Sequence, residues 1–289
     1  SMSEFNYRYV NPIMERQDAI VQKRLKLQIY PFILRRMKRD VAKDLPNKVE
    51  NVSFCELTSE QRDFYMEVLD STKEELFKSI EQNGLEKSRM SIFSALLRLR
   101  QICCHPRLYD KEQFKGKISS GKFEHLKNML EDIISNGHRI LLFSQFVNML
   151  DIIKDWLERE GIPYEYLTGK TKDRQGAVER FNSNENIPIF LISLKAGGTG
   201  LNLTGADYVI HYDPWWNPAV EDQATDRAYR IGQKKKVFVY RLITKNTVEE
   251  KIQKLKSAKR NLVDNVISVD RNIVKSLTMD DVRDIFSVD

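Results

Sequence analysis

The chain has 289 residues, of which 30% are charged and 41% hydrophobic, and its formal net charge is +6. Such a length and composition favour a soluble, helix-rich protein with one or two domains and a large core. Its apolar runs stay below the roughly 18 to 20 residues that a membrane-spanning helix needs, and its first residues lack the apolar segment of a signal peptide. We therefore expect no membrane partner, and we expect the chain to begin within a longer protein.

Three cysteines occur, Cys55, Cys103 and Cys104. So few cysteines in a chain of this length indicate a reducing compartment and no disulfide framework. Structural zinc needs about four ligands, usually in two pairs, and Cys103-Cys104-His105 has no second cluster to complete a set. We expect no metal site in this chain and a packing role for all three cysteines.

The first part of the chain is predicted to be helical. Residues 1–50 are basic and helix-prone and are interpreted as a linker with a helical segment, and residues 51–117 as a helical insertion. Thr58 is a candidate helix cap, and Gln61, three positions later, is placed to reach back to it in a capping box. The loop at 115–121 marks the clearest boundary.

From 118 to 245 short apolar strands alternate with amphipathic helices, which predicts a parallel sheet covered by helices on both sides. Ligands of such sheets lie at the carboxyl ends of the strands. A final helix opens with a second capping box at Thr247, and residues 246–289 are interpreted as this helix, with its apolar face buried and its lysines outward, and a tail. The expected strands are Arg139–Phe143, Pro163–Leu167, Ile187–Ser193, Asp207–Tyr212 and Val237–Ile243.

Two loops after these strands are candidate ligand sites. The loop Leu194–Asn202 contains three glycines, which let the backbone approach a phosphate and expose its N–H groups, although tight turns use glycine as well. The loop Asp213–Pro218 holds two tryptophans between two prolines. One ring could simply anchor a rigid loop, or a ring could stack on a base or touch a groove.

The segment Gln223–Gln233 carries the strongest signal. Arg227 and Arg230 are three positions apart and are predicted to share a helix face, with Gln223 and Asp226 as polar partners that orient them. Two adjacent guanidiniums repel each other unless an anion or a carboxylate lies between them. The pair therefore suits a polyphosphate, whereas an R-x-x-R pair by itself is also common on protein surfaces.

A basic block overlaps this segment. Between Arg227 and Arg260 twelve lysines and arginines face only two acids, Glu249 and Glu250. The block is a candidate footprint for a nucleic-acid backbone. A solvated helix face is the alternative reading.

In this order, the segments resemble the Swi/Snf-type branch of the superfamily-two helicase-like ATPases, and the resemblance covers essentially the whole chain. Two positions depart from the family pattern: Tyr229 stands where histidine is usual, and Trp215-Trp216 where a single tryptophan is commoner. Motif IV matches Ile140–Phe146, the segment after it Leu167–Thr171 with Arg174 and Phe181-Asn182, motif V Lys195–Thr204, its extension Asp213–Pro218, and motif VI Gln223–Gln233. The stretch that joins two lobes resembles Pro31–Val41 with Leu45-Pro46, and Leu99–Pro106 also fits the family.

The resemblance implies an α/β, RecA-like second lobe of an ATP-dependent translocase or remodeller of double-stranded DNA, with a C-terminal brace helix. Arg227 and Arg230 would be its catalytic arginine fingers. Four residues would lie near the nucleotide: Gly200, Asn202, Gln223 and Asp226. Eight would contact DNA: Ser144, Gln145, Lys170, Thr171, Arg174, Lys195, Thr199 and Trp216.

The resemblance also implies ATP and Mg²⁺, held mainly by a first lobe in cis. That lobe needs a GxxxxGK[ST] loop and an Asp-Glu pair. Gly169-Lys170-Thr171 could end such a loop, but Tyr164 stands where its first glycine belongs, and no Asp-Glu dipeptide occurs. The chain is therefore expected to complete an ATP site rather than form one, and to be inactive by itself.

Other classes stay open at this point: a non-motor DNA-binding or regulatory module, a polymerase-recycling ATPase, or an RNA-directed helicase-like ATPase. A DNA-bound protein is a possible cargo. The tight connections lean towards a bacterial source, which would place the protein in the cytoplasm or nucleoid, and a eukaryotic source would place it in the nucleus.

Overall fold

The computed structural model describes residues 2–15, 18–32, 45–110, 119–197, 200–215, 218–263 and 277–287. The chain divides into two compact units, Ser1–Asp44 and Leu45–Asp289. No helix in the described ranges is both long and apolar enough to cross a bilayer.

The first unit is helical, as its composition predicts. The Tyr9 hydroxyl donates a hydrogen bond to Gln28 Oε1 at 2.6 Å and so ties the start of the unit to its longest helix. Most of the predicted joining stretch Pro31–Val41 lies outside the described residues. The elements are α1 (Met2–Phe5), a π-helical turn η1 (Asn6–Val10), α2 (Asn11–Glu15), α3 (Ala19–Ile29) and a 3₁₀ turn η2 (Tyr30–Phe32).

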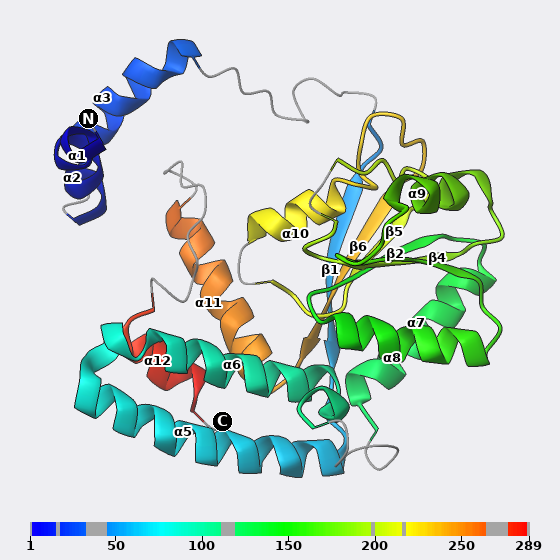
Figure 1. Cartoon of the computed structure of the whole chain (residues 1–289), viewed down its shortest axis with the longest axis horizontal. Coiled ribbons are helices and arrows are strands. Elements are labelled where there is room, and N and C mark those ends of the chain that lie inside the picture. Colours follow the sequence, from blue (N-terminus) through cyan, green and yellow to red (C-terminus); the bar gives the residue numbers. More distant parts are fainter. Residues whose placement is uncertain are drawn as a thin grey trace. The chain divides into compact units, whose positions relative to one another are not determined.

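The second unit is built on one six-stranded sheet whose order is β1-β6-β5-β2-β4-β3 (Figure 1). All five strand pairs are parallel, which confirms the predicted fold class. The strands are β1 (Lys48–Cys55), β2 (Ile140–Ser144), β3 (Tyr164–Leu167), β4 (Ile189–Ser193), β5 (Tyr208–His211) and β6 (Val237–Thr244).

Strand β1 was not among the strands expected from the sequence. It pairs along its whole length with β6, from Lys48 beside Val237 to Cys55 beside Thr244. The boundary drawn at residue 50, between the linker and the helical insertion, falls inside this strand. The domain boundaries themselves stay a prediction.

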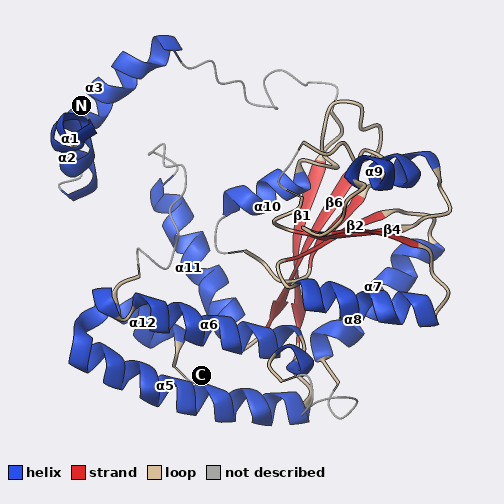
Figure 2. Cartoon of the chain, viewed as in Figure 1, coloured by secondary structure: helices blue, strands red, loops and turns tan. Residues whose placement is uncertain are grey.

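Helices cover both faces of the sheet, as Figure 2 shows. The side chains of β2 alternate: Ile140 and Leu142 pack with α7 and α8, whereas Leu141 and Phe143 pack on the opposite face with α9. This alternation is what a strand buried on both sides requires. The helices that flank the sheet are α7 (Gly121–Ser135), α8 (Val147–Arg159), α9 (Arg174–Ser183) and α10 (Pro218–Thr225).

The remaining helices form a separate apolar core beside the sheet (Figure 1). Thr58 caps the first of them by accepting from the Gln61 backbone N–H, as predicted. The Gln61 side chain was predicted to reach back to the same cap, but it is buried and bonds the Ile102 carbonyl and the Gly121 N–H instead. These helices are α5 (Ser59–Lys87), α6 (Arg89–Cys104), α11 (Val248–Val263) and α12 (Met279–Ile285).

The junction between this helical core and the sheet is closely packed. All three cysteines are buried and free there, which confirms their packing role. A Cβ at Gly121 would lie 1.9 Å from the Glu56 carbonyl oxygen, so only glycine lets α7 begin against the end of β1.

Candidate functional site

The candidate site lies where three neighbouring strands end. Strand β2 has β4 on one side and β5 on the other. The described residues at and after these strand ends, Ser144-Gln145, 194–197, 200–202 and Asp213–Trp215, therefore meet at one edge of the sheet, where open parallel sheets bind ligands. The loop after β3, which carries Lys170, lies beside them because β3 pairs with β4.

Asp213 organises the loops after β2 and β5. Its buried carboxylate accepts from the Ser144 hydroxyl and, at 3.1 Å, from the Gln145 backbone N–H. Burial raises the pKa of Asp213 to about 6, against the opposing effects of Arg100 and of the Ser144 hydroxyl. Ser144, predicted as a DNA contact, is fully buried in this arrangement.

Arg100 was not singled out from the sequence, although it belongs to the site's support. It comes from α6, is only 2% exposed, and donates through Nη2 to the Pro214 carbonyl oxygen at 2.6 Å. The same nitrogen lies 3.9 Å from the Asp213 carboxylate. The feature of the sequence that could have revealed it is a charged residue within the apolar helical stretch between Leu99 and Ile102.

The arginine pair is not on a helix, contrary to the prediction. Helix α10 ends at Thr225, and Arg227 and Arg230 lie in the turns that follow it. Arg227 is 8% exposed, whereas Arg230 is more accessible. Burial and then the Arg230 charge lower the pKa of Arg227, and Asp226 opposes them. The turn therefore holds two like charges close together.

Gln233 fixes this turn against the motif V loop. Its buried amide Nε2 donates to the carbonyl oxygens of Thr204, Ala206 and Ala228, at 3.2, 2.8 and 3.2 Å. The Leu203 N–H also donates to the Arg227 carbonyl oxygen at 3.0 Å. These bonds tie residues 203–206, which lie after β4, to the arginine turn.

The remaining predicted site residues take different positions. Gly200, at φ +42°, adopts the left-handed backbone that favours glycine. Lys170, Lys195, Asn202 and Gln223 are exposed, while Gln145, Thr171, Arg174 and Asp226 are partly buried. Thr199 and Trp216 lie outside the described residues.

The site's other predicted features have mixed outcomes. Several cations of the basic block are already paired: Arg241 with Glu50 and Glu221, and Lys245 with Glu56. Tyr229 packs its ring against the apolar core between the sheet and the helices α9 and α10, which we call the sheet-face core, and Lys48 Nζ lies 5.8 Å from the centre of the ring. In the described ranges no three acidic, histidine or cysteine side chains are grouped so that they could hold a metal ion.

His211, at the end of β5 beside the candidate site, makes the free energy of unfolding depend on pH. It is fully buried, stacks on Phe143 and bonds the Thr225 hydroxyl at 3.0 Å, and burial lowers its pKa to about 4. Below about pH 6.5 the unfolded chain binds this proton and the folded chain does not, so stability present above pH 6.5 is lost as the pH falls towards 4.

We expect His211→Asn to flatten that loss. The difference between the free energies of unfolding at pH 7 and pH 4 should shrink by up to about 3 kcal/mol relative to the parent. Urea titrations across this range measure it. The variant still keeps part of the pH dependence, because burial also lowers the pKa of His105 to about 4. An unchanged pH profile in the variant would contradict the assignment to His211.

Two family models match the chain. Residues 1–108 match the SNF2-related domain, and residues 121–232 match the helicase conserved C-terminal domain. With the parallel sheet and the arginine turn, these matches define a protein of the helicase-like ATPase class.

Solved structures and relatives narrow the class. The Sulfolobus solfataricus SWI2/SNF2 ATPase C-terminal domain matches with a TM-score of 0.67 and 33% identity, over 84% of this chain and 100% of that one. The core of that ATPase in complex with dsDNA matches with a TM-score of 0.70 and 36% identity, over 100% of this chain and 61% of that one. The chain belongs to the SWI2/SNF2 family.

Longer relatives share the sequence. Bacillus subtilis YwqA, which bears the name of a putative ATP-dependent helicase/translocase, is 40% identical over 100% of this chain and 31% of its own length. The human DNA excision repair protein ERCC-6 is 40% identical over 84% of this chain and 17% of its own length. The chain thus spans about a third or less of these curated relatives.

Proposed function

We propose that this chain is the second lobe of an ATP-driven translocase on double-stranded DNA, and that its arginine turn completes an ATP site whose phosphate loop lies on a first lobe. The observation that carries the proposal is the Arg227–Arg230 turn, which Gln233 fixes to the motif V loop. Keeping two like charges together on rigid backbone costs free energy that a bound anion recovers.

The roles within this site follow from exposure. Arg230 is the more accessible of the pair and can reach a phosphate on another lobe, while Arg227 is more deeply buried beside it. Gly200 and Asn202 are exposed in the loop after β4, which is bonded to the arginine turn. Gln223 lies on α10, about one helical turn before Arg227. ATP would supply the phosphoryl group, and Mg²⁺ would be held on the first lobe.

DNA would be gripped at the same edge of the sheet. Lys170 and Lys195 are exposed on the loops after β3 and β4, which are adjacent strands, and Arg174 begins α9 beside them. Cations on neighbouring loops suit the phosphates of one strand, without base recognition. Ser144 would act indirectly, by holding the loop through Asp213. A protein that translocates on duplex DNA would work in the nucleoid of a bacterium or in the nucleus of a eukaryote.

Removing these lysines should weaken binding to duplex DNA and make it less dependent on salt. For Lys170→Ala and Lys195→Ala we expect the slope of log K against log salt to fall by about 0.9 for each phosphate that the variant no longer neutralises. Fluorescence anisotropy with a labelled duplex at several salt concentrations measures this slope. Lys127→Ala, on α7, is the matched control and should leave the slope unchanged. Equal slopes in all variants would mean that these lysines do not bind DNA.

The two-lobe arrangement has its own test. This chain alone should hydrolyse no ATP, whereas the same sequence joined to its first lobe should show ATPase activity that duplex DNA stimulates more than single strands or RNA. Turnover by the chain alone, at the rate of the two-lobe protein, would contradict the proposal. Stimulation by RNA only would favour an RNA-directed enzyme.

A further inference from the structure

Lys256 occupies an unusual position on α11. The lysines of this helix were predicted to point outward, but the Lys256 side chain is only 8% exposed. Its Nζ donates to the Trp215 carbonyl oxygen and lies 3.3 Å from Glu221 Oε1. Lys254, two positions earlier, shows the expected behaviour, because its side chain is 70% exposed and pairs with Glu250 on its own helix.

The two partners of Lys256 belong to the candidate site. Trp215 lies in the loop that Asp213 anchors, and its ring packs against both the helical core and the sheet-face core. Glu221 is on α10, the helix that ends at the arginine turn, and it is 3% exposed. We call the loop that begins at Asp213 and contains Trp215 the tryptophan loop. The ammonium group of Lys256 therefore joins α11 both to this loop and to α10, the helix before Arg227.

Glu221 extends the connection into the sheet. Its second oxygen accepts from Arg241 Nε on β6 at 2.9 Å, and Arg241 also pairs with Glu50 on the edge strand β1. Burial acts to raise the pKa of Glu221, but Lys256 first, then His211 and Arg241, outweigh it and lower the pKa. Glu221 is thus a fixed negative charge between two cations from different elements.

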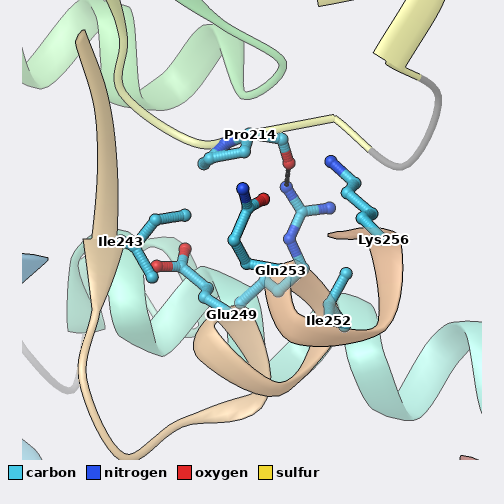
Figure 3. Close-up of a pocket in the computed structure, with 7 residues that line it drawn as sticks. Pro214, Ile243, Glu249, Ile252, Gln253 and Lys256 are labelled. Carbon is cyan, nitrogen blue, oxygen red and sulfur yellow. Dashed lines mark hydrogen bonds between the residues drawn. The ribbon is translucent and has the colours of Figure 1, made fainter. Parts of the chain in front are cut away.

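The seam between α11 and the tryptophan loop combines apolar contacts, among them Ile243 and Ile252, with polar groups. A small cavity lies there, with about 10 Å³ of space, bounded by Pro214 and Arg100 on one side and by Glu249, Gln253 and Lys256 on the other. Figure 3 shows the Lys256 side chain beside this cavity, directed towards the chain that follows Pro214. The bonds from Arg100 to the Pro214 carbonyl and from Lys256 to the Trp215 carbonyl cross this seam beside the apolar contacts, and they hold the backbone of the loop in place.

We propose that Lys256 is a positioning residue that couples the placement of α11 to the tryptophan loop and to the arginine turn, so that DNA bound at this end of the sheet stimulates ATP hydrolysis. The coupling rests on the function proposed above. Lys256 itself contacts neither DNA nor ATP.

Lys256→Met tests the coupling directly in this chain. The variant keeps an unbranched side chain only one atom shorter, but it leaves the Trp215 carbonyl without this donor and Glu221 with one cation fewer. Hydrogen exchange of peptides covering residues 207–230 should become about tenfold faster, while α7, α8 and the strands β2 and β4 stay unchanged. Lys254→Met is the control and should change neither region. Unchanged exchange over 207–230 in Lys256→Met would overturn the proposal.

The functional arm uses the two-lobe protein. Lys256→Met should reduce stimulation of the ATPase by duplex DNA about tenfold, with DNA-free ATPase and DNA affinity within about twofold of the parent, and Lys256→Arg should restore stimulation. Should Lys256→Met fail to give a cooperative thermal melt, Lys256→Gln takes its place in both arms. Full stimulation in a folded variant would refute the coupling and leave the proposed function standing. A parent without DNA-stimulated ATPase would refute the proposed function, and the exchange arm would then decide the positioning role alone.

Discussion

Arg230→Ala is expected to lower the DNA-stimulated ATPase of the two-lobe protein by about 10³-fold or more, the range that arginine fingers contribute to phosphoryl transfer. The side chain lies outside the core, at the end of a turn whose backbone is fixed by Gln233. Its removal therefore takes away charge without opening the core. Steady-state ATPase assays at saturating DNA measure the effect.

Arg230 is a cleaner target than Arg227. Arg227 is 8% exposed, so its replacement would disturb packing as well as charge. Lys234→Ala is the matched control, because Lys234 is an exposed cation four positions further along. Both Arg230→Ala and Lys234→Ala should bind duplex DNA nearly as well as the parent, and only the first should lose turnover. ATPase activity that survives in Arg230→Ala would mean that the arginine turn is not the finger.

The sheet was predictable from the sequence because most of its signal is local. The buried strands β2 and β4 are runs of five apolar or small residues, and each is followed by a change to helical periodicity or to a glycine-rich loop. Strand β1 lacks such a run: Val52 and Phe54 are exposed at the sheet edge, and its partner β6 lies almost two hundred residues later. A pairing between such distant segments leaves no pattern that a local reading can detect.

The site residues were found by motif, but their surroundings were not. Spacing alone placed Arg227 and Arg230 on a helix face, whereas the chain tightens into a turn after α10, where the Arg227 N–H bonds the Ala224 carbonyl three residues back. Ser144 was predicted to contact a DNA phosphate because it lies in the segment that resembles motif IV. Only the fold brings the Asp213 carboxylate against it, across 69 residues of chain.

Lys122→Met is expected to destabilise this chain by about 3 to 5 kcal/mol, because it leaves a buried carboxylate without its cation. Lys122 lies in the first turn of α7 and is fully buried, and its Nζ donates to Glu249 Oε2 and to the carbonyl oxygens of Tyr212 and Leu242. Burial disfavours the charged lysine, but Glu249 and the surrounding thiols outweigh it, so the pKa of Lys122 is raised.

The size of this effect follows from what Glu249 holds. Its Oε2 also accepts from the Thr244 N–H at 2.9 Å, where β6 ends and α11 is about to begin. The pair therefore joins α7, the sheet and the helix that carries Lys256, and a lone carboxylate buried there is cut off from bulk solvent. Chemical denaturation followed by circular dichroism measures the loss.

A double-mutant cycle separates the interaction energy between Lys122 and Glu249 from the free-energy cost of leaving one of them buried without its partner. Lys122→Met with Glu249→Gln should recover a large part of the loss, because no buried charge then remains, and the coupling energy should reach about 1 to 3 kcal/mol. Lys127→Met, on the same helix, breaks a pair with Glu124 whose side chains are 24% and 50% exposed, and it should cost less than about 1 kcal/mol. A loss in Lys122→Met no larger than in Lys127→Met would mean that water reaches Glu249, and that the junction of α7, β6 and α11 is held by apolar packing alone.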